Sequence, residues 1–585
     1  MTNLQNLITN NIDIWTSAIK KRSATGRGSS KKIELTGVKK LRELILDLAV
    51  RGKLLSQDQN DDSVSKLLKS IDEEKAELIK NKELKRSKVL PDLLEDECTF
   101  DLPESWLWCR LGNVCKKLTD GSHNPPSNSG VGFPMLSCQN VNYGKVDFSS
   151  PSRYVTEEDF HQENKRTKIQ PNDVLLSIVA SIGRSAVVPD DAPKFVLQRS
   201  VAVLQSQMSP FYFSYMLTSP LCINYYNTHA KGTAQKGIYL GKLSLMPLAI
   251  PPLAEQHRIV TKVDELMVLC DQLEQQTEKS ISAHQALVNV LLNTLTASAD
   301  AQEFSQNWKR IAEHFDTLFT TEYSIEQLKQ TILQLAVMGK LVPQVDNDEP
   351  ASVLLERISA VKEQLLADKT IKKQKALPEI SEDEKSFVLP KGWNWVRLQD
   401  ITSKITDGDH QTPPRIDAGK RLLSAKNVRD GFLDFENCDF ISDEHFNKSR
   451  ERCLPEKGDL LIVSVGGTIG RSSLVPNDSD FALVRSVALI KPLLFNTQFF
   501  KYAADGPLLQ SSIHANKRGG AQPCLYLSEI SKFPFPLPPL EEQGRIVDKL
   551  DEMMNVCNHL TTQISNNQNT KINLAEALVK QGLSH

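Results

Sequence analysis

One helix-start motif occurs twice in this chain, and the rest of the sequence repeats around it. The stretch PPLAEQHRIVTKVDELM begins at Pro251, and PPLEEQGRIVDKLDEMM begins 287 residues later, at Pro538. Proline is tolerated in the first turn of a helix, and the helix dipole favours acids such as Glu255 and Glu542 there. Each copy therefore predicts the start of a helix.

Both predicted helices carry one apolar stripe. Its residues recur at alternating spacings of four and three, which is typical of a helix that packs along another helix. The stripes consist of Ile259, Val263, Leu266, Cys270 and Leu273 in the first copy and Ile546, Leu550, Met553, Cys557 and Leu560 in the second. Packing within its own domain would explain one copy, but two copies at a fixed offset favour a matched pair. Helices of roughly 40 residues would be roughly 60 Å long and could hold two modules at a set separation.

Two further helical segments repeat at the same offset. KKLRELILDLAVRGKLL from Lys39 is answered by EQLKQTILQLAVMGKLV from Glu326, and a charged helix follows each copy. We expect the charged helices to be antiparallel partners of the long helices. Residues 1–20 predict one short amphipathic helix, and the basic arm between Lys20 and Lys53 contains the run SATGRGSSKK, which favours a flexible segment.

Each half also contains a mixed α/β module. ESWLWCRLGNVCKKLTDGSHNPP from Glu104 is answered by GWNWVRLQDITSKITDGDHQTPP from Gly392. Later in each module, DVLLSIVASIGRSAVVP from Asp173 is answered by DLLIVSVGGTIGRSSLVP from Asp459. Runs of Val, Ile and Leu bounded by Gly and Pro predict buried strands, so we expect a sheet with flanking helices. The stretches between these blocks differ, which indicates that the two modules contact different things.

Composition excludes several classes of protein. The chain has 585 residues, 40% apolar content and a formal net charge of −2, which predicts a globular protein of several domains. No apolar run approaches the roughly 18 residues that span a bilayer, and no basic segment precedes an apolar core at the N-terminus. We therefore expect a cytoplasmic protein without membrane contact. Ten cysteines without a Cys-x-x-Cys pair argue against a structural zinc site and a disulfide framework.

The catalytic motifs that the sequence approaches are incomplete. Residues 124–127 (Asn-Pro-Pro-Ser) lack the aromatic that closes the Asn/Asp-Pro-Pro-aromatic tetrad of amino-methyltransferases and stacks on the flipped base. No phosphate-binding loop of the Gly-x-x-x-x-Gly-Lys-Ser/Thr type is present. His123 and His410 have no Cys or His neighbours at ligand spacing. We predict no catalytic residue and no metal site in this chain.

What remains in both modules is a set of polar and basic side chains on loops. Such side chains contact base edges and phosphates in protein–DNA complexes. The candidates in the first module are Lys116, Lys117, Thr119, Asp120, Ser122, His123, Gln139, Asn140, Arg184, Lys231, Gln235, Lys236 and Tyr239. The candidates in the second module are Lys404, Thr406, Asp407, Asp409, His410, Gln411, Lys426, Asn427, Arg471, Lys517, Arg518, Gln522 and Tyr526. For Arg199 and Arg485, which stand within strand-like runs, we expect buried ion pairs instead.

Three doubled motifs carry a resemblance to a known family. They are Pro-Pro-Leu-x-Glu-Gln-x-x-Ile-Val, Asp-x-Leu-Leu…Ile-Gly-Arg (Asp-Leu-Leu in the second copy) and Leu-Ala-x-x-Gly-Lys-Leu. In this order and at nearly one offset, they make the sequence similar to the DNA-specificity (S) subunits of Type I restriction-modification enzymes. The resemblance covers nearly the whole chain. The motifs match helical stretches and mark no base-contacting position.

The resemblance implies a mixed α/β fold with an internal pseudo-two-fold repeat. Two target recognition domains would be separated by a pair of long antiparallel coiled-coil helices, and each domain would read one half of a bipartite site on double-stranded DNA. The chain itself would be noncatalytic and would bind no cofactor. It would bind two modification subunits, which carry S-adenosylmethionine and the adenine-N6 chemistry, and restriction subunits with the ATP- and Mg²⁺-dependent motor and nuclease.

The implied domain division follows the repeat. The first half comprises the N-terminal helices with the basic arm (1–103), the first recognition domain (104–250) and the central long helix (251–300). The second half comprises the helical repeat of the N-terminal region (301–388), the second recognition domain (389–537) and the C-terminal long helix (538–585). Two alternatives stay open. A stand-alone DNA adenine methyltransferase would transfer methyl groups as a purified chain, and a coiled-coil adaptor would show no sequence-dependent DNA binding even with its partners.

Overall fold

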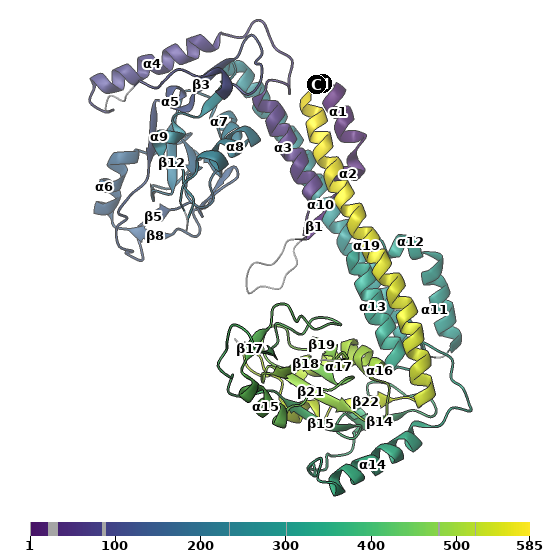
Figure 1. Cartoon of the computed structure of the whole chain (residues 1–585). Helices are drawn as coiled ribbons and strands as arrows, with labels where there is room; N and C mark the ends of the chain where they lie inside the picture. The colour runs from purple at the N-terminus through teal and green to yellow at the C-terminus, as the bar shows by residue number, and fades with distance from the viewer. Residues whose placement is uncertain are drawn as a thin grey trace. The chain divides into compact units, whose positions relative to one another are not determined.

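The chain forms two compact units. Unit 1 combines Met1–Ser280 with Asn567–His585, and unit 2 is Ile281–Asn566. The computed structural model, drawn in Figure 1, describes residues 2–21, 33–84, 89–232, 235–299, 301–477, 480–520 and 522–584. Residues 22–32, which hold the run SATGRGSSKK of the basic arm, lie outside the described residues.

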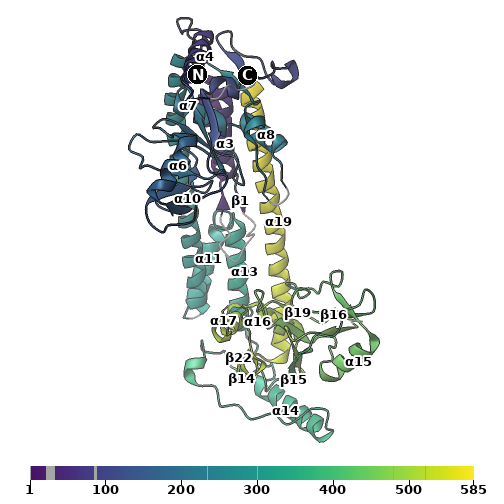
Figure 2. The ribbon, with the colours of Figure 1, turned by 90° about the vertical axis from the view of Figure 1, so that its left-hand side faces the viewer.

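Two helices of 45 residues each start where the doubled motif predicted. They are α10 (Leu253–Ala297) and α19 (Leu540–Ser584). Helix α10 begins in unit 1 and ends in unit 2, whereas α19 begins in unit 2 and ends in unit 1, so the two run in opposite directions. Figure 2 shows α19 as one uninterrupted helix. Stripe residues such as Val263 and Leu550 are fully buried, as expected for the apolar face of a helix that packs along other elements.

The first turn of α10 is tied to the module that precedes it. The buried Glu255 carboxylate accepts hydrogen bonds from Trp106 Nε1 and from Gln57 Nε2, both at 2.9 Å. One turn later, Arg258 forms two hydrogen bonds with Asp61, at 2.9 and 2.5 Å. Burial raises the pKa of the Glu255 carboxyl, and the two donors oppose that shift. These hydrogen bonds occupy the side chains of Glu255 and Arg258 and hold the start of the helix in place.

Unit 2 repeats this network residue by residue. Glu542 accepts hydrogen bonds from Trp393 Nε1 at 2.9 Å and from Gln344 Nε2 at 2.7 Å. Arg545 likewise pairs with Asp348. Each partner stands 287 positions after its counterpart, so the repeat seen in the sequence is a repeat of side-chain contacts.

The motif glutamine joins the helix start to a second helix. Gln256 Oε1 accepts from the backbone N–H of Ser209 at 2.9 Å, and its Nε2 donates to the carbonyl of Pro251 at 3.0 Å. Gln543 makes the equivalent bond with the N–H of Asn496 at 2.8 Å. Ser209 and Asn496 precede helices of the two modules, so each long helix extends rigidly from its module.

The Gly-Lys pair of the third motif ends one helix and caps another. Helices α3 (Thr36–Val50) and α13 (Glu322–Val337) each stop just before a glycine with positive φ, Gly52 at 69° and Gly339 at 67°. A Cβ on either would meet the ring of Pro103 or Pro390. The next lysine caps a long helix, because Lys53 Nζ donates to the carbonyl of Leu583 at 2.6 Å and Lys340 Nζ to that of Ser298 at 2.8 Å. A cation is favoured at a helix C-terminus.

The strands of the two modules follow one topology. Module 1 contains β3 (Leu107–Arg110), β4 (Lys117–Asp120), β5 (Phe133–Leu136), β6 (Val141–Asn142), β7 (Lys145–Val146), β8 (Arg153–Val155), β9 (Val174–Ser177), β10 (Ser185–Val187), β11 (Val196–Leu197), β12 (Val201–Gln205) and β13 (Pro247–Ile250). Module 2 contains β14 (Asn394–Arg397), β15 (Thr402–Asp407), β16 (Lys420–Leu423), β17 (Asp439–Ile441), β18 (Leu460–Val463), β19 (Ser472–Leu474), β20 (Phe481–Leu483), β21 (Val487–Pro492) and β22 (Pro534–Leu537). A separate two-stranded pair, β1 (Lys20–Lys21) and β2 (Ile33–Glu34), precedes α3.

Each module has a four-stranded sheet, a three-stranded sheet and a two-stranded ribbon (β13-β3 or β14-β22), and module 1 has a second ribbon, β6-β7. The four-stranded orders are β10-β9-β12-β4 and β15-β21-β18-β19, and all their pairings are antiparallel. The three-stranded orders, β11-β5-β8 and β17-β16-β20, contain one parallel pairing each. Residues from both sheets share an apolar cluster, with Leu136 and Val203 in module 1 and Leu423 and Leu489 in module 2. The single sheet that we expected is therefore two sheets, because strands of two to six residues interrupted by turns separate into layers.

The helices of the modules lie between or after these strands. Module 1 contains α5 (Leu111–Val114), α6 (Glu157–Thr167), α7 (Pro210–Thr218), α8 (Pro220–His229) and α9 (Leu240–Leu243). Module 2 contains α15 (Asp443–Arg452), α16 (Thr497–Asp505), α17 (Pro507–Asn516) and α18 (Leu527–Ile530). Unit 2 also includes α11 (Ala301–Glu313) and α12 (Phe315–Leu318), and in this unit one apolar core runs from the helices into the module.

Two helix predictions need correction. The N-terminal segment forms α1 (Thr2–Thr9) and α2 (Ile12–Ser17), because the side chain of Asn11 binds the carbonyl of Leu7 at the break. The charged helices α4 (Val64–Lys80) and α14 (Ala351–Ala367) contact the modules and are not the partners of the long helices that we expected.

Contacts of two half-buried lysines show where the charged helices pack. Lys75 on α4 donates to the carbonyl of Asn113 at 2.9 Å, and Lys362 on α14 donates to that of Gln399 at 2.6 Å. The antiparallel partner of the first part of α10 is α3. Its Arg42 contacts Asp271 at 2.6 Å, while residues after α3 reach back to the start of α10.

A buried arginine attaches the segment before each module. Arg397 binds Glu384 through two hydrogen bonds at 2.6 and 2.9 Å, and Arg110 binds Glu97 in the same way at 2.6 and 2.7 Å. The hydrogen bonds from Arg397 lower the pKa of Glu384 to about 2.

We predict that removing one donor from the helix junction destabilises unit 1. Trp106→Phe keeps an aromatic ring but takes the N–H from the buried Glu255 carboxylate, so the free energy of unfolding should fall by about 1.5–3 kcal/mol. Denaturant unfolding of the full chain, followed by circular dichroism, measures this loss. Trp108→Phe is the matched control, because Trp108 is less buried and keeps an aromatic contact with Phe100. Equal losses in both variants would contradict the role given to the hydrogen bond.

We predict that acid releases the segment anchored by Glu384. A carboxyl whose folded-state pKa is lowered contributes stability above its unfolded pKa of about 4.3, and that stability is lost as the pH falls towards 2. Hydrogen exchange at residues 379–385 should therefore accelerate between about pH 4.3 and 2, after correction for intrinsic rates. Glu384→Gln should remove this acid-dependent step, and a step that persists in the variant would assign it to another group.

Candidate nucleic-acid interface

Loops from distant parts of module 1 are joined at one end of its sheets. The N–H of Ser122 donates to the carbonyl of Leu197 at 2.7 Å, and the N–H of Arg199 donates back to Ser122 at 2.9 Å. The N–H of Cys138 donates to Ser200 Oγ at 3.0 Å. A Cβ on Gly121 would overlap the carbonyl of Leu197, so the close approach requires glycine.

Two further loops extend this edge. The N–H of Ile178 donates to the carbonyl of Ser200, and the N–H of Ala180 donates to that of Lys236, both at 2.9 Å. We call residues 121–124, 137–140, 178–181, 198–200 and 231–239 the rim loops of module 1, of which 233 and 234 are not described.

Module 2 repeats the arrangement bond for bond. The N–H of Asp409 donates to Leu483 O at 2.8 Å, and the N–H of Arg485 donates to Asp409 O at 3.0 Å. The N–H of Ala425 donates to Ser486 Oγ at 3.1 Å. The rim loops of module 2 are residues 408–411, 424–427, 464–467, 484–486 and 517–526, without the undescribed residue 521. The two modules thus present their rim side chains, several of which differ, on the same pattern of backbone hydrogen bonds.

The rim loops bring together about half of the candidates chosen from the sequence. The exposed ones are His123, Gln139, Lys231, Gln235, Lys236, Tyr239, His410, Gln411, Lys426, Lys517, Arg518, Gln522 and Tyr526. Arg518 lies over the ring of Tyr526, with 5.9 Å from Cζ to the ring centroid. Lys426 also pairs with Asp439 at 2.8 Å. Thr119, Arg184 and Arg471 are partly exposed beside these loops.

Two asparagines that we selected hold the rim from inside. Asn140 and Asn427 are 2% and 0% exposed. Asn140 accepts from the N–H of Ser137 at 3.0 Å and donates to the carbonyl of Ser150 at 2.8 Å. Asn427 accepts in the same way from the N–H of Ser424 at 3.0 Å. Because both side-chain amides form hydrogen bonds within their own module, Asn140 and Asn427 are not candidate DNA contacts.

Other candidates are also occupied by their own module. The buried ones are Asp120, Ser122 and Thr406. The lysines Lys116, Lys117 and Lys404 bind Glu74 at 2.9 Å, the carbonyl of Thr167 at 2.8 Å and the carbonyl of Arg452 at 2.6 Å. Burial lowers the pKa of Lys117. Asp409 accepts from Ser449 Oγ, and Asp407 pairs with Arg452 at 2.7 Å.

Sequence reasoning placed two rim arginines wrongly. Arg199 and Arg485 are exposed at turns that precede β12 and β21, not buried in ion pairs. The following Ser200 and Ser486 accept hydrogen bonds from the distant loops at Cys138 and Ala425, so the local sequence carried no signal for these turns.

Each rim also contains an aspartate shared between a histidine and an arginine. In module 1, Asp120 lies 2.9 Å from His123 Nε2 and contacts Arg166 at the end of α6. In module 2, Asp407 lies 3.2 Å from His410 Nε2 and 2.7 Å from the Arg452 guanidinium at the end of α15. Sequence reasoning did not select either arginine, because the helices that carry them lie in the differing stretches.

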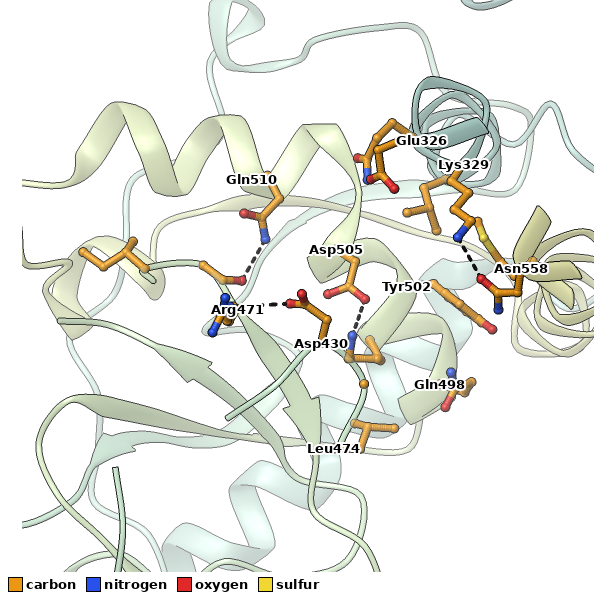
Figure 3. A pocket seen from close by; sticks show the side chains of 17 residues that line it. Glu326, Lys329, Asp430, Arg471, Leu474, Gln498, Tyr502, Asp505, Gln510 and Asn558 are labelled. Atoms are coloured by element: carbon orange, nitrogen blue, oxygen red, sulfur yellow. Dashed lines mark hydrogen bonds and ion pairs between the residues drawn. The ribbon is translucent and has the colours of Figure 1, made fainter. Parts of the chain in front are cut away.

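A polar cleft of about 720 Å³ lies beside module 2, within unit 2. Figure 3 shows Arg471 at this cleft, together with Asp505 and Gln510. The Arg471 side chain is 35% exposed and lies 4.0 Å from the Asp430 carboxylate. Asp505 pairs instead with the buried Lys501 and accepts from Ser472 Oγ at 2.7 Å. Arg471 is thus the less constrained cation of this cleft.

Two other features, a metal-binding cluster and a membrane-spanning helix, are absent from the described residues. Among the described residues, no group of three or more His, Cys, Asp and Glu side chains is placed to hold a metal ion. In the same part of the chain, no helix combines the length and apolar character needed to cross a membrane.

Comparison with known proteins identifies the family. Residues 103–283 and 390–568 both match the family described as "Type I restriction modification DNA specificity domain". The Escherichia coli Type I restriction enzyme EcoAI specificity subunit is 36% identical across 99% of this chain and 100% of its own length. The EcoEI specificity subunit of the same species is 35% identical at the same coverage. This chain therefore belongs to the DNA specificity subunits of Type I restriction-modification enzymes.

The family membership confirms the predicted fold class and noncatalytic role. As a specificity subunit, the chain binds the DNA target sequence within the complex. A solved HsdS subunit from Thermoanaerobacter tengcongensis matches 83% of this chain and 98% of its own length, at 19% identity and a TM-score of 0.34.

Proposed function

We propose that each module reads one half of a bipartite DNA target through its rim loops. The observation that carries this proposal is one backbone frame presenting different exposed side chains, such as Gln139 in module 1 and Lys426 at the matching position of module 2. Amide and ammonium groups recognise base edges in the major groove. Loops that share a backbone frame but carry different side chains are suited to reading two half-sites of different sequence.

The catalytic functions would reside on partner subunits. We propose that two modification subunits supply S-adenosylmethionine and transfer the methyl group to adenine N6. Restriction subunits would supply the ATP- and Mg²⁺-dependent motor and nuclease. The names of the relatives, as subunits of Type I restriction enzymes, support this assignment. A DNA target also supports a cytoplasmic location.

We predict that specificity is modular. Replacing residues 104–250 by the corresponding domain of another specificity subunit should change one half-site and leave the other unchanged, because each rim is built within one module. Mapping methylated adenines in a host that carries the complex measures the outcome. The reciprocal exchange of residues 389–537 is the matched control and should change the other half-site. If either exchange altered both half-sites, independent reading would be wrong.

We also predict that Arg471→Ala weakens DNA binding more than it weakens the fold. Its side chain is partly exposed at the cleft and has only a distant ion pair within the module. Loss of one DNA contact should cost about 1–3 kcal/mol in binding. Affinity and thermal unfolding of the complex are measured together, and Arg471→Lys, which keeps the charge, should bind better than the alanine variant. A lower unfolding temperature with unchanged affinity would place Arg471 among the residues that support the fold.

A further inference from the structure

The two rims share one charged arrangement, whereas several of their other exposed side chains differ. In both, a largely buried aspartate contacts an exposed histidine and a half-exposed arginine. The side chain of Asp120 is 10% exposed and that of His123 is 53% exposed, against 14% for Asp407 and 57% for His410. The arginines, Arg166 and Arg452, are 48% and 49% exposed.

The aspartate holds both neighbours in fixed positions. Arg166 Nε also donates to the backbone carbonyl of Asp120 at 3.0 Å, and the Arg166 guanidinium lies 3.3 Å from His123 Nε2. In module 2 the Arg452 guanidinium lies 2.9 Å from His410 Nε2. Each carboxylate is thus contacted by one histidine and one arginine, and about half of each of these two side chains remains exposed to a ligand.

A second arginine is attached to the same turn through its backbone. The backbone N–H of Arg199 binds the carbonyl of Ser122, the residue directly before His123. The backbone N–H of Arg485 binds the carbonyl of Asp409, directly before His410. Both arginine side chains are exposed. In each module the aspartate therefore contacts one histidine and one arginine, and a backbone hydrogen bond joins the same turn to a loop that carries a second, exposed arginine.

Two other exposed rim pairs, Gln235/Gln522 and Tyr239/Tyr526, are also identical at the offset of 287, but further neighbouring positions are not. Residues 287 positions apart pair Asn124 with Gln411 and Gln139 with Lys426. A side chain that is the same in both modules does not distinguish two half-sites of different sequence. The feature that any two half-sites have in common is the phosphate backbone, and clustered arginine donors are typical phosphate ligands.

We propose that these two clusters bind DNA phosphates, and that the differing rim residues select the bases. The phosphate-binding set is His123, Arg166 and Arg199 in module 1 and His410, Arg452 and Arg485 in module 2. This inference rests on the proposed function, because it takes the rim loops as the DNA-reading surface. In each module the cluster fixes the position of the loop over the duplex, and Gln139 or Lys426 is then held against a base edge.

The test uses the full complex with its modification subunits. Equilibrium binding is measured for Arg199→Ala and Arg485→Ala on a duplex carrying the target, found from methylation mapping, and on a duplex without it, over a range of salt concentrations. Each variant should bind both duplexes roughly ten-fold more weakly, because one charge-assisted phosphate contact is lost. The slope of log affinity against log salt should decrease in magnitude by about one, and the methylated sequence should not change.

Two further variants separate charge from position. Arg199→Lys should recover part of the affinity because it keeps the charge. Lys69→Ala removes an exposed positive charge from α4, which lies near Lys116 at the opposite end of β4 from Asp120, and it should leave affinity and slope unchanged.

The possible outcomes separate this inference from the proposed function. An altered half-site sequence in Arg199→Ala or Arg485→Ala would show a base contact and overturn the inference. Unchanged affinity and slope in both variants would overturn it as well, while normal target discrimination by the wild-type complex would leave the proposed function standing. Absence of discrimination by the wild-type complex would instead refute the proposed function.

Discussion

The buried carboxylates of Glu255 and Glu542 are the contacts on which the rest of each unit depends. Each joins the first turn of a 45-residue helix to a tryptophan of the module and to a glutamine that follows α3 or α13. A buried charge is costly without its partners, so removing a donor exposes the full desolvation penalty. Motion of the module relative to the helix start would break these bonds, and the module and helix start therefore behave as one body.

The motifs that define this family are accounted for by the fold. The glutamate, glutamine and arginine of the helix start each have a partner within their own unit. The Gly-Lys pair ends one helix and caps another. These side chains are therefore occupied within their own unit. The exposed rim side chains lie in loops whose frame is fixed by backbone bonds, so the residues in those loops can change without loss of the scaffold.

The shared frame also explains how two specificities fit on one chain. Backbone hydrogen bonds constrain where a loop lies but not which side chain it carries, as Cys138 and Ala425 show by donating to equivalent serines. The asparagines below these turns, Asn140 and Asn427, fix the loop path from inside. Variation in sequence recognition can therefore be confined to a few outward positions.

The sequence by itself determined the elements whose signal is local or repeated. Periodicity, the positions of glycine and proline and the 287-residue offset predicted the two long helices, the equivalent helices α3 and α13, and the core strands. Only the tertiary structure decided which polar side chains are used internally. Asn140 looked like a DNA contact and is buried, whereas Arg199 looked buried and is exposed. The physical reason is that the burial of a polar group depends on partners supplied by distant segments, and periodicity along the chain carries no information about those partners.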